Sequence, residues 1–464
     1  MSGRKGRNPF SLLVTISSNK LYLAFFVALL SFMFIDILSI RLSNLTVSPE
    51  QTEWKLYNYI LISCVCLLGQ YAILRYVRHG PQQIESSKVL NLRALLKIAI
   101  ITQLVLSAII LLVMVQVFQF HYYNTIFLTF AVNISYWVGI TMLSILAIRL
   151  FSWFLAYRSI VIILYAIASS AICLNLILTN LFFNTITHHE VIRDFIGNST
   201  IVIPVGTITD FLFTLVFYSS IISFIFTWTA TAALLSYNSK KISRTGYWTV
   251  MSLPLVYFLV QFFPFFTDAI LFVLYENPLL YSILLTTIFT MSKPIGGILF
   301  GIALYVTARK MNYKLKRNMS IAGLGLVILF SSNQANLFVY RTFPPFGLAT
   351  VSFVSLSSFL VLIGIYSSAI SVAQDRTLSG SIKGRIEEQT RLLAGIGKAH
   401  EIQLLTNRAL TVLREQKENM EKDSGLESSL TDEELKSHIN MVIDEIQRVR
   451  ETKPPHDDNK GNTD

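Results

Sequence analysis

One run of five residues, Lys293-Pro294-Ile295-Gly296-Gly297, could place chemistry inside an otherwise apolar stretch of the chain. A charged side chain near the centre of a bilayer costs about 2.5–3.5 kcal/mol on insertion scales, so it marks a candidate site. Proline removes a backbone donor and glycines loosen a helix, so the run predicts a broken or kinked helix. A helix broken there would free backbone carbonyls, which transporters use as ion ligands. The alternative is a kinked packing helix whose lysine snorkels to the interface or bonds a neighbour.

A buried lysine needs a polar partner, and the sequence offers two carboxylates inside predicted spans. Asp36 lies in the outer third of the first span and Asp268 lies late in the seventh, so depth favours Asp36. The uncharged candidates at mid-depth are Asn133, Gln261 and Asn333. Each of these alone is more often a packing hydrogen bond than a site. We predict that Lys293 lies within hydrogen-bond or salt-bridge reach of one of these five residues.

Other constellations that could support catalysis or metal binding are weak. Cys64 and Cys66 would face opposite sides of a helix, and His188-His189 lacks a third ligand at metal-site spacing. The chain carries no glycine-rich phosphate or dinucleotide motif, no G-x-S-x-G elbow and no H-E-x-x-H string. A phosphoacceptor role for His400 is not expected, because the tail after it is too short for an ATP-binding domain. We therefore expect no enzyme, no cofactor and no metal site.

The composition shows which elements must position these residues. Of 464 residues, 53% are apolar and 14% are charged, against about 45–50% and about 25% in soluble domains. A helix needs about 20 apolar residues to cross a bilayer. Ten stretches qualify, at residues 21–40, 56–74, 98–117, 125–148, 159–183, 211–235, 247–273, 279–306, 321–338 and 348–372. The sequence thus predicts an all-α fold, a polytopic membrane helix bundle of about ten transmembrane helices with a short helical cytoplasmic tail.

Lysine and arginine set the orientation of the predicted spans. Leaving out the tail after the tenth span, nineteen of them fall before the first span or after the second, fourth, sixth or eighth, and four fall in the opposite set. This bias puts both termini in the cytoplasm of a multi-pass protein of the cell membrane, with residues 1–20 as a cytoplasmic segment and a retained first span. The net charge of +11 therefore reports topology. The expected partners of the basic loops are the lipid bilayer and its anionic head groups, and no nucleic acid is expected.

The composition changes at about Ser371, and residues 373–451 are predicted to form a cytoplasmic helical tail before a disordered end at 452–464. Gly395 and Gly397 are expected to break its first helix, with a second helical stretch from 399 to about 421. In the third helix, apolar residues follow a capping box at spacings of 4 and 3, at Leu435, Ile439, Val442, Ile446 and Val449. Two heptads are too few for an independent coiled coil. This helix is expected to pack on its own tail or to bind a protein partner or a second copy.

Three classes of function fit these features. The favoured one is a membrane sensor or signal transducer that couples the helix bundle, through the last span, to the helical tail and a partner. The second is a secondary transporter of a small solute or ion with a midplane site around Lys293. Ten spans permit two inverted halves, but the third span, which would correspond to the eighth, contains no glycine or proline. The third class is a structural or assembly subunit of a membrane complex.

Overall fold

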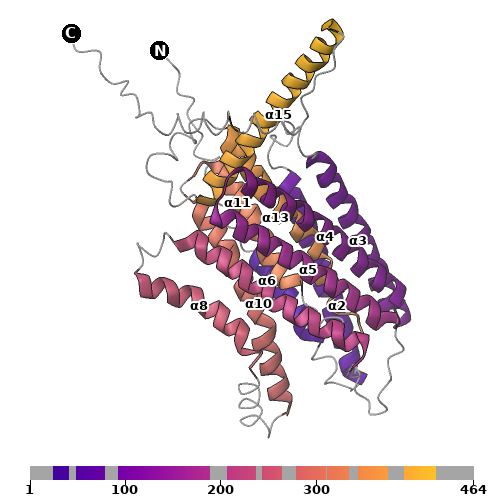
Figure 1. Cartoon of the computed structure of the whole chain (residues 1–464). Coiled ribbons are helices and arrows are strands. Elements are labelled where there is room, and N and C mark those ends of the chain that lie inside the picture. The colour runs from indigo at the N-terminus through magenta and orange to yellow at the C-terminus, as the bar shows by residue number, and fades with distance from the viewer. Residues whose placement is uncertain are drawn as a thin grey trace, which may run out of the picture.

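The computed structural model is a bundle of helices from which one long helix projects (Figure 1). It describes residues 25–40, 49–78, 92–188, 206–236, 243–263, 278–309, 311–333, 343–374, 391–424 and 441. An N-terminal helix covers Phe25–Ile40. The others are α2 (Pro49–Arg78), α3 (Leu92–Phe120), α4 (Thr125–Ala156), α5 (Ile160–His188), α6 (Ile208–Leu235), α8 (Arg244–Val260), α10 (Pro278–Ala308), α11 (Tyr313–Ser332), α12 (Leu348–Val351), α13 (Phe353–Gln374) and α15 (Arg391–Ser424).

Seven of the described helices are long and apolar enough to cross a membrane, which makes the chain a multi-pass membrane protein. They fall on the predicted second to sixth, eighth and tenth spans. The other three predicted spans also overlap helices that are less suited to crossing alone. The N-terminal helix is short, α8 has 17 residues, and α11 starts with a basic turn and ends at Ser332. The count of ten therefore stays a prediction.

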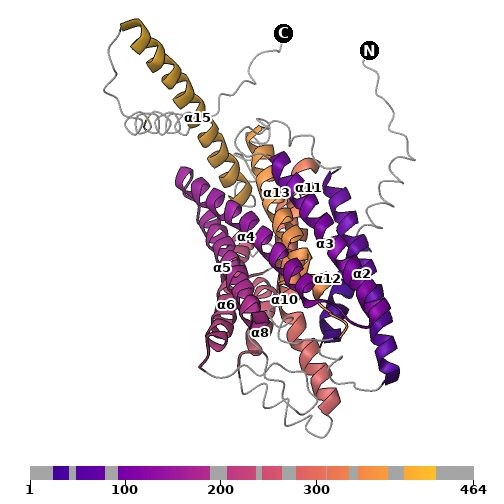
Figure 2. The same cartoon turned by 90° about the vertical axis from the view of Figure 1, so that its right-hand side faces the viewer.

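The last span is the central helix of the bundle. α12 and α13 run almost continuously, and every residue from 344 to 372 is buried. They contact α2, α3, α4, α11 and α15, and Figure 2 shows them between α4 on one side and α2 and α3 on the other. By contrast, only 33% of the most apolar stretch of α3 or α6 is buried. The last span is thus surrounded by protein, while α3 and α6 keep a broad face for lipid.

Small residues let α10 and α11 approach each other closely. A Cβ atom on Gly301 would lie 2.6 Å from the carbonyl oxygen of Gly323, and one on Gly323 would lie 2.6 Å from that of Gly301. On the far side of α11, a Cβ atom on Gly364 would lie 2.7 Å from that of Ala322. Glycine at such crossings permits backbone contact between membrane helices. α10, α11 and the central helix are therefore packed at short range.

The Lys-Pro-Ile-Gly-Gly run does not break its helix, because α10 is helical from Pro278 to Ala308 with Pro294 inside it; the alternative, a kink at this run, stays a prediction. Its two glycines are held by neighbouring side chains. A Cβ atom on Gly296 would lie 2.3 Å from the ring of Phe224 in α6, and one on Gly297 would lie 2.9 Å from Cβ of Phe330 in α11. Packing from two sides keeps the helix intact despite the donor that proline removes.

The first half of α15 packs on α4, α5 and α13, and its second half extends beyond the bundle (Figure 1). The predicted break at Gly395 and Gly397 is wrong, because α15 continues through both. A Cβ atom on Gly395 would lie 3.0 Å from Ile162, so this glycine serves close packing against α5. The predicted stretch 399–421 lies within α15. The heptad positions of the third tail helix and residues 1–20 and 452–464 lie outside the described residues.

Candidate functional site

The structure does not bring the predicted site residues together around Lys293. Lys293 is half-buried on α10, and within the described part of the chain it makes no hydrogen bond or ion pair. Gln261 donates to the carbonyl oxygen of Phe258 in the preceding turn, at 2.8 Å. Asp268 lies outside the described residues. The expected pairing of Lys293 with Asp36 is not found, because Asp36 is bound elsewhere.

Asp36 caps the last span. Its Oδ1 accepts the backbone N–H of Gly347 at 2.9 Å, and its Oδ2 accepts the backbone N–H and the hydroxyl of Thr350 at 3.3 and 2.6 Å. Gly347 is the N-cap residue of α12, at φ 90°, and it has no side chain to satisfy the free N–H groups of the first turn. Asp36 supplies that cap from another helix, with its negative charge at the positive end of the helix dipole.

A side chain from α4 interrupts the last span between α12 and α13. The hydroxyl of Ser135 donates to the carbonyl oxygen of Val351 at 2.8 Å and accepts the N–H of Ser355 at 3.4 Å. In a regular helix these two backbone groups would bond to each other. A side chain inserted between them is a known cause of a kink. The last span is therefore interrupted between α12 and α13, whereas α10 is continuous through Lys293 and Pro294.

Polar contacts extend from this break to α2 and α3. The amide of Gln70 donates to the hydroxyl of Ser352, and its Oε1 accepts the hydroxyl of Ser107 at 3.1 Å. One turn before Ser107, Gln103 is 2% exposed. Both polar atoms of its amide lack a hydrogen-bond partner within the described chain. A row of buried polar groups thus follows the central helix from Asp36 to Gln70 and continues through Ser107 to Gln103 on α3.

A second polar group, the asparagine network, joins α4, α5, α6 and the end of α11. Asn333 is the C-cap residue of α11; it donates to Oδ1 of Asn175 at 2.8 Å and accepts the hydroxyl of Tyr136 at 3.3 Å. Asn175 donates in turn to the hydroxyl of Ser219 at 2.8 Å. Two of the predicted candidates, Asn133 and Asn333, therefore pair with amides of α5, since Asn133 exchanges two 3.0 Å hydrogen bonds with Asn184. These satisfied pairs fit a packing role.

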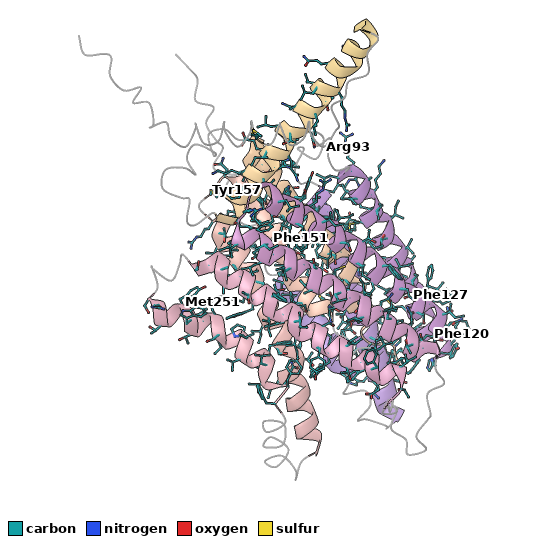
Figure 3. All side chains as sticks on the ribbon, in the orientation of Figure 1. Arg93, Phe120, Phe127, Phe151, Tyr157 and Met251 are labelled. Atoms are coloured by element: carbon teal, nitrogen blue, oxygen red, sulfur yellow. The ribbon has the colours of Figure 1, made fainter. Side chains whose placement is uncertain are left out.

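A third group lies where α15 docks on the bundle. The ring of His400, 4% exposed, lies edge-on to Trp153 and Tyr366 at centroid distances of 6.3 and 5.9 Å. Burial lowers the pKa of His400 below its ordinary value, and the nearby Arg149 lowers it further. The docked imidazole is therefore neutral at neutral pH. Lys398 adds a cation–π contact, 5.3 Å above the ring of Tyr157, which Figure 3 shows at the end of the bundle beside α15.

Sequence reasoning missed the residues that connect these groups. Gln70, Gln103, Asn175 and Asn184 each lie in a predicted span or next to its end, and Ser135 looked like an ordinary helix residue. The available signal was an amide side chain in a long apolar stretch, since such a group needs a partner in the bundle interior.

No protein-family model, no curated protein and no solved structure matches this chain. The features that can indicate a function are therefore the three polar groups and the last span, which connects the Asp36 group to the His400 group.

Proposed function

We propose that the chain is a membrane sensor or signal transducer that couples its helix bundle, through the last span, to α15 and a partner. The position of the central helix carries this proposal. It is buried along its length, its first turn is bound by Asp36, and Tyr366 in its second half contacts His400 of α15. Close-packed interiors transmit displacement because they hold few voids. A change at the Asp36 end can therefore reach α15.

Two features give the central helix alternative arrangements. The Ser135 hydroxyl, inserted between Val351 and Ser355, leaves a joint at which α12 can tilt relative to α13. Gly395 and His400 form the docking surface of α15, and through it α15 can separate from α4, α5 and α13. A stimulus shifts the equilibrium between the docked and the separated arrangement only if it stabilises one of them more than the other. Binding or protonation near Asp36 would meet that condition.

The output would come from the projecting half of α15. Val412 there is 52% exposed, and the heptad from Leu435 to Val449 stays a predicted partner-binding surface. Arg149 lies beside the docked α15, and Figure 3 shows Arg93 at the same end of the bundle. Basic residues at this end support a cytoplasmic α15 in a cell membrane, with anionic lipid head groups around it.

The test measures the position of α15 in liposomes. Spin labels at Val412→Cys and at Ile160→Cys, which is 76% exposed at the start of α5, report their separation in a background where the three native cysteines are alanine. Asp36→Asn weakens the cap of α12 and should shift the distance distribution. Asn133→Ala, which breaks an amide pair that does not touch the last span, is the matched control. A folded Asp36→Asn variant with the wild-type distribution would contradict the proposed coupling.

A secondary transporter is the second candidate, and the interrupted last span beside a buried polar row favours it. Transporters build substrate sites from discontinuous helices with polar groups near the break. The observed break lies at Ser352, so the proposed transport site moves there from Lys293. Charge movement on solid-supported membranes, screened over protons, Na⁺ and small solutes, would reveal transport. A current that Gln70→Leu abolishes would favour transport, whereas a structural subunit would show neither a current nor motion of α15.

A further inference from the structure

Asp36 holds a buried charge without a basic partner. The carboxylate is 1% exposed, and its hydrogen bonds come from Gly347 and Thr350. Among the residues that the structure describes, no lysine or arginine forms an ion pair with it. An isolated charge inside a protein is costly unless it is paired. Backbone and hydroxyl donors lower that cost, but they leave the net charge of −1 in place.

The register between the N-terminal helix and α2 shows what faces Asp36. Asn58 donates to the hydroxyl of Ser39 at 3.2 Å. Further along, a Cβ atom on Gly69 would lie 2.5 Å from Leu29. These two contacts fix the helices as antiparallel neighbours. Asp36 therefore lies opposite the turn of α2 that directly follows Asn58.

That turn carries two buried hydroxyls with no hydrogen-bond partner in the described chain, those of Tyr59 and Ser63. They are 1% and 0% exposed. The Tyr59 hydroxyl lies beside the Ser63 hydroxyl and within electrostatic range of the Asp36 carboxylate. Neither hydroxyl makes a hydrogen bond of regular geometry within the described chain. The ring of Tyr59 is fixed by an edge-on contact with Phe346, at 5.7 Å, just before the capped helix. A buried polar group left unsatisfied costs about 1–3 kcal/mol, so the two hydroxyls point to a ligand.

We propose that Asp36, Tyr59 and Ser63 bind a monovalent cation, either Na⁺ or a proton carried as hydronium. One carboxylate and two hydroxyls supply the oxygen ligands that hard cations prefer. Within the described chain Oδ1 of Asp36 accepts one hydrogen bond, from Gly347, so a lone pair is left for the α2 side. A single positive charge neutralises the carboxylate, whereas a divalent ion would add a net charge beside the positive end of α12. The cation therefore lies toward α2, away from Gly347.

This site deepens the proposed function by naming its ligand class, and only its consequence for α15 rests on that function. A cation on the α2 side draws charge from the carboxylate that caps α12. Binding therefore competes with the bonds from Gly347 and Thr350 and biases the start of the central helix. Because Asp36 is buried, the cation reaches it only when the helices around it separate transiently.

The test is the thermal unfolding of the purified full-length protein in detergent, in NaCl, KCl or choline chloride at equal ionic strength and pH. Bound cation stabilises the folded state with a saturating concentration dependence. We expect a Tm that rises with Na⁺ and saturates. Tyr59→Phe and Ser63→Ala each remove one ligand oxygen and should weaken the apparent affinity about tenfold or more, which corresponds to about 1.4 kcal/mol. Asp36→Asn should abolish the response.

Tyr165→Phe is the matched control, because it removes another unpaired buried hydroxyl, on α5, and should keep the response. A titration of pH in choline chloride separates the two cations. A Tm that depends on pH through Asp36, without a Na⁺ effect, identifies the proton. Equal Tm values in all three salts, with a pH dependence that Asp36→Asn leaves unchanged, would overturn the site. If Asp36→Asn does not fold, unaltered responses in Tyr59→Phe and Ser63→Ala overturn it instead.

These measurements test the cation site and the proposed transducer function independently of each other. A cation response without any shift of the α15 distance keeps the site and contradicts the transducer. A shift of α15 caused by another stimulus, without a cation response, contradicts the site and keeps the transducer function.

Discussion

α10 and the last span reverse what their sequences suggest about helix continuity. α10 contains a lysine, a proline and two glycines within five residues and remains helical, whereas the last span is interrupted at Ser352, where no proline occurs. The difference lies in their neighbours. Phe224 and Phe330 pack against the glycines of α10, and Ser135 replaces a backbone hydrogen bond of the last span. Helix interruption in this bundle is set by tertiary contacts more than by local propensity.

The largest expected effect is on the capped end of the last span. Asp36→Ala would leave the N–H groups of Gly347 and Thr350 buried without an acceptor. Hydrogen bonds to a charged group contribute about 1.5–3 kcal/mol each, so we expect a loss of about 3 kcal/mol or more in the free energy of unfolding in mixed micelles. A loss below about 1 kcal/mol would show that α12 does not depend on this cap. It would contradict the conclusion that tertiary contacts set the structure of the last span.

The next effect concerns the glycines of α10. Gly296→Ala would place a methyl group 2.3 Å from the Phe224 ring, which stacks on Phe258 at a centroid distance of 3.9 Å and has little freedom to move. Overpacking of this kind costs about 1–3 kcal/mol. We expect a lower Tm, measured by tryptophan fluorescence in detergent. Gly139→Ala is the control for added volume, because a Cβ atom there would lie 3.1 Å from its nearest neighbour, Val354, and should cost less.

Acidification should separate α15 from the bundle. Burial lowers the pKa of docked His400, so the neutral ring binds and the protonated ring is released. Docking is therefore strongest above the ordinary histidine pKa of about 6.5 and weakens as the pH falls below it. The distribution of distances between labels at positions 412 and 160 should broaden as the pH falls from 7.5 to 5. His400→Phe keeps the aromatic packing and should remove the pH dependence; an identical dependence in that variant would assign it to another group.

A smaller effect is expected at the break itself. Ser135→Ala removes the inserted hydroxyl, and the groups of Val351 and Ser355 can then bond directly. The net loss should be about 0.5–1.5 kcal/mol, the usual contribution of one hydrogen bond. Amide hydrogen exchange at Ser355 should slow as the regular bond forms. Faster exchange would show that the serine stabilises the last span rather than kinking it.

The smallest effect is expected at Lys293. Lys293→Met removes a charge for which the described residues provide no hydrogen bond or ion pair, so the free energy of unfolding should stay within about 0.5 kcal/mol or rise. A loss above about 2 kcal/mol would show that Lys293 has a buried partner and would restore the predicted polar site in α10.

The helices follow from the sequence more readily than their contacts do. Predicted spans 56–74, 98–117 and 125–148 fall inside α2, α3 and α4, because apolar length decides which segments enter a bilayer. The ninth span was placed too far along, since Asn333 ends α11 as a C-cap. Asp36 and Asn333 were identified as costly residues, but their partners were not. Asp36 bonds to Gly347, 311 positions away, and hydropathy gives depth along a helix without showing which neighbour each face meets.

The burial of the last span also has a consequence for biosynthesis. α13 comes after the bundle helices α2, α3, α4 and α11 in the chain, so a ribosome completes its neighbours first. These helices must then wait in the membrane with Gln70 and Ser135 facing a place that the last span has yet to occupy. Assembly is finished when α12 and α13 enter between them and the first turn of α12 meets Asp36, a residue made near the beginning of translation.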